Sequence, residues 1–198
     1  MAIIAADGHA GLARPEGTVM DLVERDATLR QLHDCLRKTA GGAGHVALIS
    51  GEAGIGKTSL LRALASLETE VVLWWGGCDA LQSPRPLAPL YDITRSNKTG
   101  FDDMLVAGGD RIALFEAVLA SLVRGPQPIL LVIEDAHWAD AATLDLLKFL
   151  GRRIEGTSCL LAVSFRDDEV GATHPLRRLM PGRIVRPGGW SVSLRRAA

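Results

Sequence analysis

Two hydrophobic patterns alternate along the chain. Short continuous apolar runs, typical of strands buried on both faces, occupy residues 45–50, 70–75, 129–133 and 158–164. Between these runs, apolar residues recur three or four positions apart, which predicts helices over residues 27–38, 59–67, 111–123 and 141–153. Strands that alternate with helices are typical of a parallel sheet with helices on both faces. We therefore predict an α/β fold with right-handed crossovers.

The segment between the second strand and the third predicted helix is less regular. Residues 78–90 contain three prolines and predict a loop, with a short helix around residues 87–93. Residues 96–110 are polar and rich in glycine, which predicts a mobile connection. Trp74 and Trp75 are neighbours on the second strand, so their side chains are expected to face opposite sides of the sheet.

These patterns divide the chain into three parts. Residues 1–20 predict a loose leader, residues 21–186 a compact α/β core, and residues 187–198 an irregular basic tail. The run at residues 183–186 predicts the start of a fifth strand, after which no regular structure is expected.

Composition and charge exclude several classes of protein. The 198 residues carry a net charge of −1, so no basic excess indicates nucleic acid as the main partner. Cys35, Cys78 and Cys159 lack metal-ligand spacing and are expected to fill the core of a protein from a reducing compartment. Neither a secretory signal nor an apolar run of membrane-spanning length is evident, so we expect a cytoplasmic protein without membrane contact.

The clearest chemical motif is the segment Gly-Glu-Ala-Gly-Ile-Gly-Lys-Thr at residues 51–58. It lies between a predicted strand and a predicted helix, as a phosphate-binding loop requires. The alternative interpretation is a glycine turn between a strand and a helix that happens to be followed by a lysine. Its backbone N–H groups and the helix N-terminus favour phosphate oxygens. Lys57 is expected to reach the β- and γ-phosphates of a nucleotide, and the Thr58 hydroxyl to bind Mg²⁺. The predicted nucleotide-binding residues of this segment are Gly51, Gly54, Ile55, Gly56, Lys57, Thr58 and Ser59.

Two acids, Glu134 and Asp135, end the third apolar run. In nucleotide hydrolysis, one such carboxylate holds Mg²⁺ and another orients or deprotonates the attacking water. We expect their strand to lie beside the first strand, so that both acids reach the metal and the reacting phosphate. Two solvated acids at a strand end remain the alternative.

Several segments together resemble the signal-transduction ATPases (STAND) of the AAA-related class. More narrowly, they resemble the Orc1-like ATPase module at the front of large LuxR-type bacterial transcriptional regulators. The matching segments are residues 22–26, 51–58, 133–140, and 165–169 followed by 174–176. The resemblance covers about residues 21–186, and residues 134–140 (Glu-Asp-Ala-His-Trp-Ala-Asp) are its most specific part. It implies a P-loop NTPase three-layer sandwich with a mostly parallel sheet.

The resemblance also implies roles for individual residues. Val23 and Arg25 match the border of the adenine pocket, and Arg166 matches an arginine that senses the γ-phosphate and joins Lys57 and the two acids in catalysis. A surface arginine paired with Asp167 or Asp168 is the alternative for Arg166. Glu134 replaces the aspartate that is frequent in the family, so the division of roles between the two acids stays open. His137 and Trp138 are expected to be structural or coupling residues.

The function implied is an ATP-binding, slowly hydrolysing nucleotide switch that uses ATP, ADP and Mg²⁺. We expect a protein partner or self-association through the ATPase face, and no nucleic acid contact by the ATPase core itself. The family's helical lid has no counterpart after residue 186, which predicts a truncated or frameshifted chain. Two alternatives stay open: a small-molecule phosphotransferase with residues 78–110 as its acceptor site, and a nonhydrolysing remnant of a larger regulator.

Overall fold

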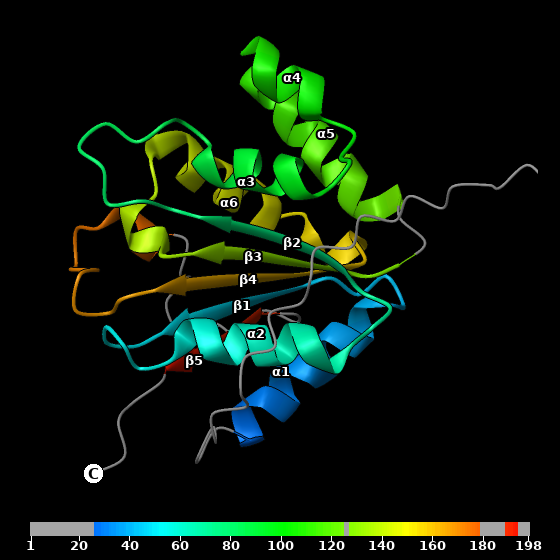
Figure 1. The fold of residues 1–198 in the computed structure, drawn as a ribbon, viewed down its shortest axis with the longest axis vertical. Helices are drawn as coiled ribbons and strands as arrows, with labels where there is room; N and C mark the ends of the chain where they lie inside the picture. Colours follow the sequence, from blue (N-terminus) through cyan, green and yellow to red (C-terminus); the bar gives the residue numbers. More distant parts are fainter. Residues whose placement is uncertain (1–25, 125–126, 179–188, 194–198) are drawn as a thin grey trace, which may run out of the picture.

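A five-stranded parallel sheet forms the centre of the molecule (Figure 1). The structure, a computed structural model, describes residues 26–124, 127–178 and 189–193. Its strands are β1 (His45–Ser50), β2 (Val72–Gly77), β3 (Ile129–Glu134), β4 (Cys159–Phe165) and β5 (Gly189–Ser193). They lie in the order β2-β3-β4-β1-β5. The predicted α/β fold with a parallel sheet is confirmed.

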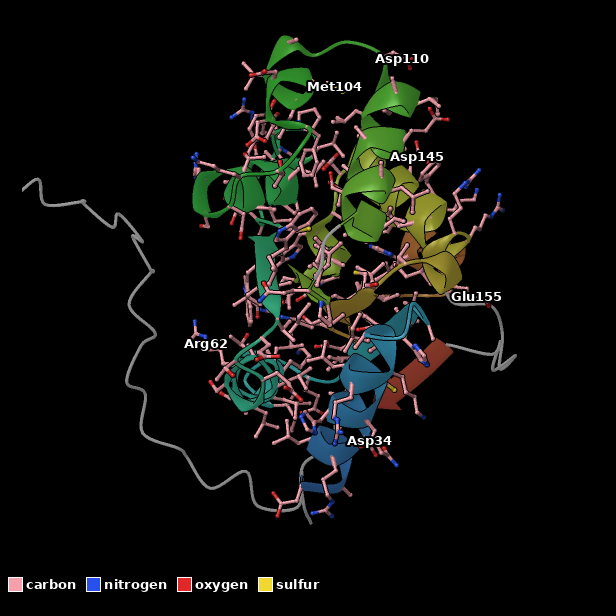
Figure 2. The ribbon with its side chains drawn as sticks, turned by 90° about the vertical axis from the view of Figure 1, so that its right-hand side faces the viewer. Asp34, Arg62, Met104, Asp110, Asp145 and Glu155 are labelled. Atoms are coloured by element: carbon pink, nitrogen blue, oxygen red, sulfur yellow. The ribbon has the colours of Figure 1, made fainter. Side chains whose placement is uncertain are left out.

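Helices cover both faces of this sheet (Figure 1; turned by 90° in Figure 2). One face carries α1 (Asp26–Thr39) and α2 (Lys57–Leu67), and the other carries α3 (Ala88–Ser96), α5 (Arg111–Arg124) and α6 (Ala141–Gly151). The short helix α4 (Asp102–Ala107) precedes α5, and the described residues also form three 3-10 helices: η1 (Ala136–Trp138), η2 (Ile154–Gly156) and η3 (Pro175–Arg178). Among the described helices, none combines the length and the apolar character that a membrane span requires.

The two faces bury separate hydrophobic clusters, because neighbouring residues of β3 and β4 point to opposite sides. Leu130 and Leu160 pack on the side of α1 and α2, whereas Leu131 and Leu161 pack on the side of α3, α5 and α6. All residues of β4 are buried. Burial of one such leucine contributes about 1.5–3 kcal/mol. Cys35, Cys78 and Cys159 are buried free thiols within these clusters, as predicted.

The strand order corrects one sequence-based expectation. The third strand was expected beside the first, but β4 lies between them, pairing with β1 through Ala47↔Ala162 and with β3 through Leu131↔Leu161. A continuous apolar run predicts that a strand is buried on both faces, yet it does not state which strands are its neighbours. The sequences of β3 and β4 are both typical of central strands, so the hydrophobic pattern alone does not determine which of them lies beside β1.

The C-terminal segment also differs from its prediction. No regular structure was expected over residues 187–198, but Gly189–Ser193 forms β5 and pairs in parallel with β1, with Leu48 opposite Ser191. The mixed composition of this segment does not indicate a strand by itself. Pairing with β1 stabilises the strand, and that contact is not visible in the local sequence pattern. The predicted strand start at 183–186 and the leader at 1–20 lie outside the described residues. The boundaries 21–186 and 187–198 stay predictions.

Residues 96–110, expected to be mobile, contain an anchored helix, α4. Phe101, which precedes it, is fully buried, and its ring meets that of Trp74 edge-on with centroids 5.7 Å apart. Four residues later, Leu105 is buried, and its carbonyl accepts a 2.9 Å hydrogen bond from the Tyr91 hydroxyl. Two apolar residues at helical spacing therefore outweigh the polar composition of the segment.

Gly76, near the end of β2, supports a prediction on stability. A Cβ at this position would lie 2.3 Å from the Pro89 carbonyl oxygen, so we expect Gly76→Ala to lower the free energy of unfolding by about 1–3 kcal/mol. The neighbouring Gly77 provides the matched control, because a Cβ there would meet no atom within 4 Å. Urea unfolding of both variants measures the difference, and equal midpoints would contradict the close approach of α3 to β2.

Candidate active site

The loop between β1 and α2 owes its shape to two glycines in left-handed conformations. Gly54 has φ 70°, and Gly56, the residue before α2, has φ 90° and ψ 30°. A Cβ on Gly54 would meet nothing within 4 Å, so backbone conformation rather than space favours glycine there. The first turn of α2 closes directly on the loop, because the Leu60 N–H donates to the Gly56 carbonyl at 3.0 Å. This places a helix N-terminus at the loop, as phosphate binding requires.

Lys57 folds back over this loop. Its Nζ donates to the carbonyl oxygens of Gly51 at 2.7 Å and Glu52 at 2.9 Å, and the residue is only 7% exposed. Burial lowers the pKa of Lys57, whereas the charge of Asp135 raises it and that of Arg166 lowers it. The ammonium group therefore lies in the electrostatic field of residues that follow β3 and β4.

Glu134, the last residue of β3, connects the loop to the sheet. Its Oε1 accepts a 2.5 Å hydrogen bond from the Thr58 hydroxyl at the start of α2. Its Oε2 accepts a 2.8 Å hydrogen bond from the indole N–H of Trp75 on β2. The loop and the strand-end acid thus meet although β4 separates their strands, because α2 begins at this end of the sheet (Figure 1).

Asp135 follows in a conformation that few residues adopt. Its backbone has φ 50° and ψ 43°, in the left-handed region, where aspartate is among the better tolerated residues. Its N–H donates to the Ser164 hydroxyl on β4 at 3.2 Å, and Ser164 is 1% exposed. The carboxylate Oδ1 lies 3.9 Å from Nδ1 of His137. The backbone at Asp135 is therefore fixed by the neighbouring strand.

Arg166, directly after β4, is paired. Its Nη1 donates to Oε1 of Glu169 at 2.5 Å, and its guanidinium carbon lies 4.9 Å from the centre of the Trp138 ring. The Trp138 indole N–H donates to the other oxygen of Glu169 at 3.1 Å. The partner of Arg166 is therefore Glu169, rather than Asp167 or Asp168 as the alternative interpretation expected.

His137 has a structural position beneath this pair. Its side chain is buried, and its Nδ1 accepts a hydrogen bond from the Arg166 backbone N–H at 3.4 Å. Burial lowers the pKa of His137, while the carboxylates of Glu169 and Asp135 raise it, and the net shift is downward. Its backbone carbonyl interacts with the His174 ring at 3.1 Å. These contacts tie the segment after β3 to the segment after β4.

The donors at this site fit Mg²⁺ together with a nucleotide, rather than a metal held by protein alone. No group of three or more His, Cys, Asp or Glu side chains that could hold a metal ion occurs in the part of the chain that the structure describes. Thr58 and Glu134 together present two oxygens at one point. Mg²⁺ commonly binds one or two protein oxygens and completes its octahedron with phosphate oxygens and water.

The structure brings most of the predicted site residues to one edge of the sheet. Lys57 and Thr58 begin α2, Glu134 is the last residue of β3, and Asp135 and Arg166 directly follow β3 and β4. Of the remaining predicted residues, Ile55 packs into the cluster under α2, Ser59 is exposed, and Val23 and Arg25 lie outside the described residues.

Three residues at this edge were not predicted. Ser164 is the single polar residue between apolar neighbours in β4, and that isolation is a signal the sequence offers. Glu169 lies three residues after Arg166, a spacing that permits local pairing. Trp75 carries no local signal, because its contact with Glu134 depends on β2 being the neighbour of β3.

Comparisons with known proteins agree with this geometry. A family model described as an AAA ATPase domain matches residues 21–163. Among curated proteins, none matches the chain. Cdc6p from Pyrobaculum aerophilum is similar in structure, with 21% identity, a TM-score of 0.60, and coverage of 91% of this chain and 48% of that one. The Orc1 protein of Aeropyrum pernix, solved in complex with DNA, is similar in structure with 18% identity and a TM-score of 0.51. The match covers 93% of this chain and 49% of that one.

A STAND protein with a tetratricopeptide repeat sensor from Pyrococcus horikoshii is similar at 20% identity and a TM-score of 0.46, over 83% of this chain and 22% of that one. The chain spans about half the length of the Cdc6p and Orc1 chains. At these identities the likeness to the Cdc6p and Orc1 chains shows the fold alone.

Proposed function

The chain belongs to the AAA ATPase domain family, and from this premise we propose that it binds Mg·ATP, hydrolyses it slowly and serves as the nucleotide switch of a regulatory ATPase. The observation that carries the proposal is the 2.5 Å hydrogen bond between the Thr58 hydroxyl and Glu134, beside the loop that holds Lys57. A hydroxyl and a carboxylate at this distance, next to a cation and a helix N-terminus, suit a phosphate-bound divalent cation.

In this proposal, the loop binds the phosphates of the nucleotide. The N–H groups at the start of α2 face the phosphate oxygens, and the Lys57 ammonium exchanges its two carbonyl acceptors for the β- and γ-phosphates. Thr58 and Glu134 would hold Mg²⁺, which, when bound, would neutralise charge on the phosphates. Val23 and Arg25 are proposed to border the adenine.

The two acids then have different roles. Glu134 is already hydrogen-bonded through both carboxylate oxygens, one of them to Thr58, so it is the acid that would share the metal. Asp135 follows with a fixed backbone and a carboxylate that is 38% exposed, which leaves it accessible to water. We assign to Asp135 the orientation or deprotonation of the attacking water.

Arg166 is proposed to link the reaction to a conformational change. Its partner Glu169 is partly exposed, and ion pairs of this kind are weak, so a γ-phosphate competes effectively for the guanidinium. Because Glu169 also accepts the Trp138 indole N–H, loss of Arg166 from Glu169 alters the contacts of the segment after β3. Such a local rearrangement is a typical means of coupling nucleotide state to a partner.

The wider context is proposed by resemblance. We propose that the domain acts within a STAND-type, LuxR-type transcriptional regulator of the cytoplasm, and that a protein partner or a second copy contacts the ATPase face. We propose no nucleic acid contact by the ATPase core, whose chain has a net charge of −1. The phosphotransferase alternative gains no support, because Leu90, Ile93 and Phe101 in its supposed acceptor segment fill the core.

A titration of the purified chain with a fluorescent ATP analogue tests the proposal. We expect saturable binding that requires Mg²⁺ for full affinity, and a melting temperature that rises with ligand, since saturation at 100 times Kd contributes about 2.7 kcal/mol. Phosphate release measured with and without small-molecule acceptors separates hydrolysis from phosphotransfer. Binding without release would leave a nonhydrolysing nucleotide switch, and the lack of any binding would refute the proposal.

A further inference from the structure

Two adjacent tryptophans on β2 have different environments. Trp74 is 4% exposed and packs against Phe101 in the cluster beneath α3 and α5. Trp75 points to the opposite face and packs against the cluster that α1 and α2 cover. Gly77 of β2 lies opposite Glu134 of β3 in the strand register. Trp75 is two residues before Gly77 and therefore faces the same side of the sheet, so of the two tryptophans it is the one that reaches Glu134.

In the hydrogen bond between Trp75 and Glu134, the indole N–H is the donor and the carboxylate is the acceptor. An indole N–H is a donor only, so the indole nitrogen of Trp75 cannot coordinate a cation and cannot accept a proton from Glu134. It occupies Oε2 at 2.8 Å while Oε1 receives the Thr58 hydroxyl at 2.5 Å. The two donors approach different oxygens from different elements, and together they fix the plane of the carboxylate.

We propose that Trp75 is a positioning residue for Glu134: its indole N–H holds Oε2, so that Oε1 faces the Thr58 hydroxyl and the cation that these two oxygens would share. The inference rests on the proposed function, because it concerns how Glu134 presents itself to Mg²⁺. The terminal torsion of a glutamate is broad, so without this anchor the hydrogen bond from the Thr58 hydroxyl alone would orient the carboxylate. The hydrogen bond from Trp75 restricts the Glu134 carboxylate already in the folded protein, so less conformational entropy is lost when the cation binds.

Trp75→Phe, with Trp74→Phe as its matched control, tests this role. Phenylalanine keeps an aromatic ring at each position and removes the indole N–H. We expect Trp75→Phe to raise the Mg²⁺ concentration that half-saturates binding of a fluorescent ATP analogue by about threefold to tenfold, the usual net effect of losing one hydrogen bond. Binding of the same analogue in EDTA should stay unchanged. Trp74→Phe should leave the Mg²⁺ dependence at the wild-type value.

A double substitution separates positioning from packing. If Trp75 acts through Glu134, Trp75→Phe should cause no further change in Mg²⁺ dependence in a Glu134→Gln background. An additive effect in that background would overturn the inference. So would equal Mg²⁺ dependence of Trp75→Phe and Trp74→Phe. If the wild type itself shows no Mg²⁺-dependent nucleotide binding, the proposed function fails first, so the two failures are distinguishable.

An NMR measurement tests the same bond without substituting Trp75. The indole N–H resonance of Trp75 should shift when Glu134 is changed to Gln and when Mg²⁺ and the ATP analogue are added, since its acceptor changes in both cases. The resonance of Trp74, on the opposite face, should respond to neither. If no indole resonance responds to either change, the positioning role is wrong, whether or not Trp75→Phe folds.

Discussion

Lys57→Ala is expected to weaken Mg·ATP binding by about 2–4 kcal/mol, roughly 30-fold to 1000-fold. Lys57 is the only cationic residue among residues 51–58, and at 7% exposure its charge is poorly screened by water. Alanine removes that charge and its reach to the β- and γ-phosphates. The Gly51 and Glu52 carbonyls, which accept from Nζ, can accept from water instead, so the loss falls on binding rather than on folding.

Titration with a fluorescent ATP analogue, followed by thermal unfolding without ligand, measures both quantities. Lys148→Ala is the matched control, because Lys148 is an exposed cation on α6. Unchanged affinity in Lys57→Ala would mean that the loop is not the nucleotide site. Equal losses in the two lysine variants would indicate a nonspecific charge effect, which salt would also weaken.

Asp135→Asn is expected to reduce phosphate release by about 100-fold to 10,000-fold, the usual contribution of a general base, with little change in Mg·ATP affinity. Asparagine retains the shape and tolerates the left-handed backbone at this position, where φ is 50°. Its amide accepts no proton, so only the chemical step should suffer. Single-turnover phosphate release, measured at saturating Mg·ATP, isolates that step from binding.

Glu134→Gln is the matched comparison for Asp135→Asn. It should act mainly on the Mg²⁺ dependence of binding, because Glu134 is the acid hydrogen-bonded to Thr58. If Glu134→Gln abolishes turnover while Asp135→Asn impairs Mg²⁺ binding, the roles of the two acids are reversed. If neither variant changes turnover, the hydrolytic part of the proposal is wrong.

Local features of the fold and the site were predictable from the sequence. The phosphate loop is a continuous segment whose glycines, lysine and threonine stand in fixed order between a strand and a helix. Asp140 directly precedes α6 in the sequence, and its carboxylate accepts from the N–H groups of Ala142 and Thr143, as an aspartate at an N-cap does. In such cases neighbours in the sequence are also neighbours in space.

Features that depend on strand pairing were not predictable. The contact between Trp75 and Glu134 requires β2 beside β3, and the bond from Asp135 to Ser164 requires β4 beside β3. Parallel strands are joined by long crossovers, so hydrophobic runs carry no information on which strand pairs with which. For the same reason β5 was missed, because its pairing with β1 joins distant parts of the chain.

The place of β4 between β1 and β3 also bears on how the protein folds during synthesis. The phosphate loop leaves the ribosome before β4, and His45 pairs with Leu160, so β1 gains this neighbour only after the residues through β4 have been made. Contacts of such long range form slowly. Until β4 inserts, the loop and the acids at Glu134 and Asp135 belong to separate halves of the sheet. A nascent chain should therefore acquire nucleotide affinity abruptly and late, and bound nucleotide should then oppose unfolding.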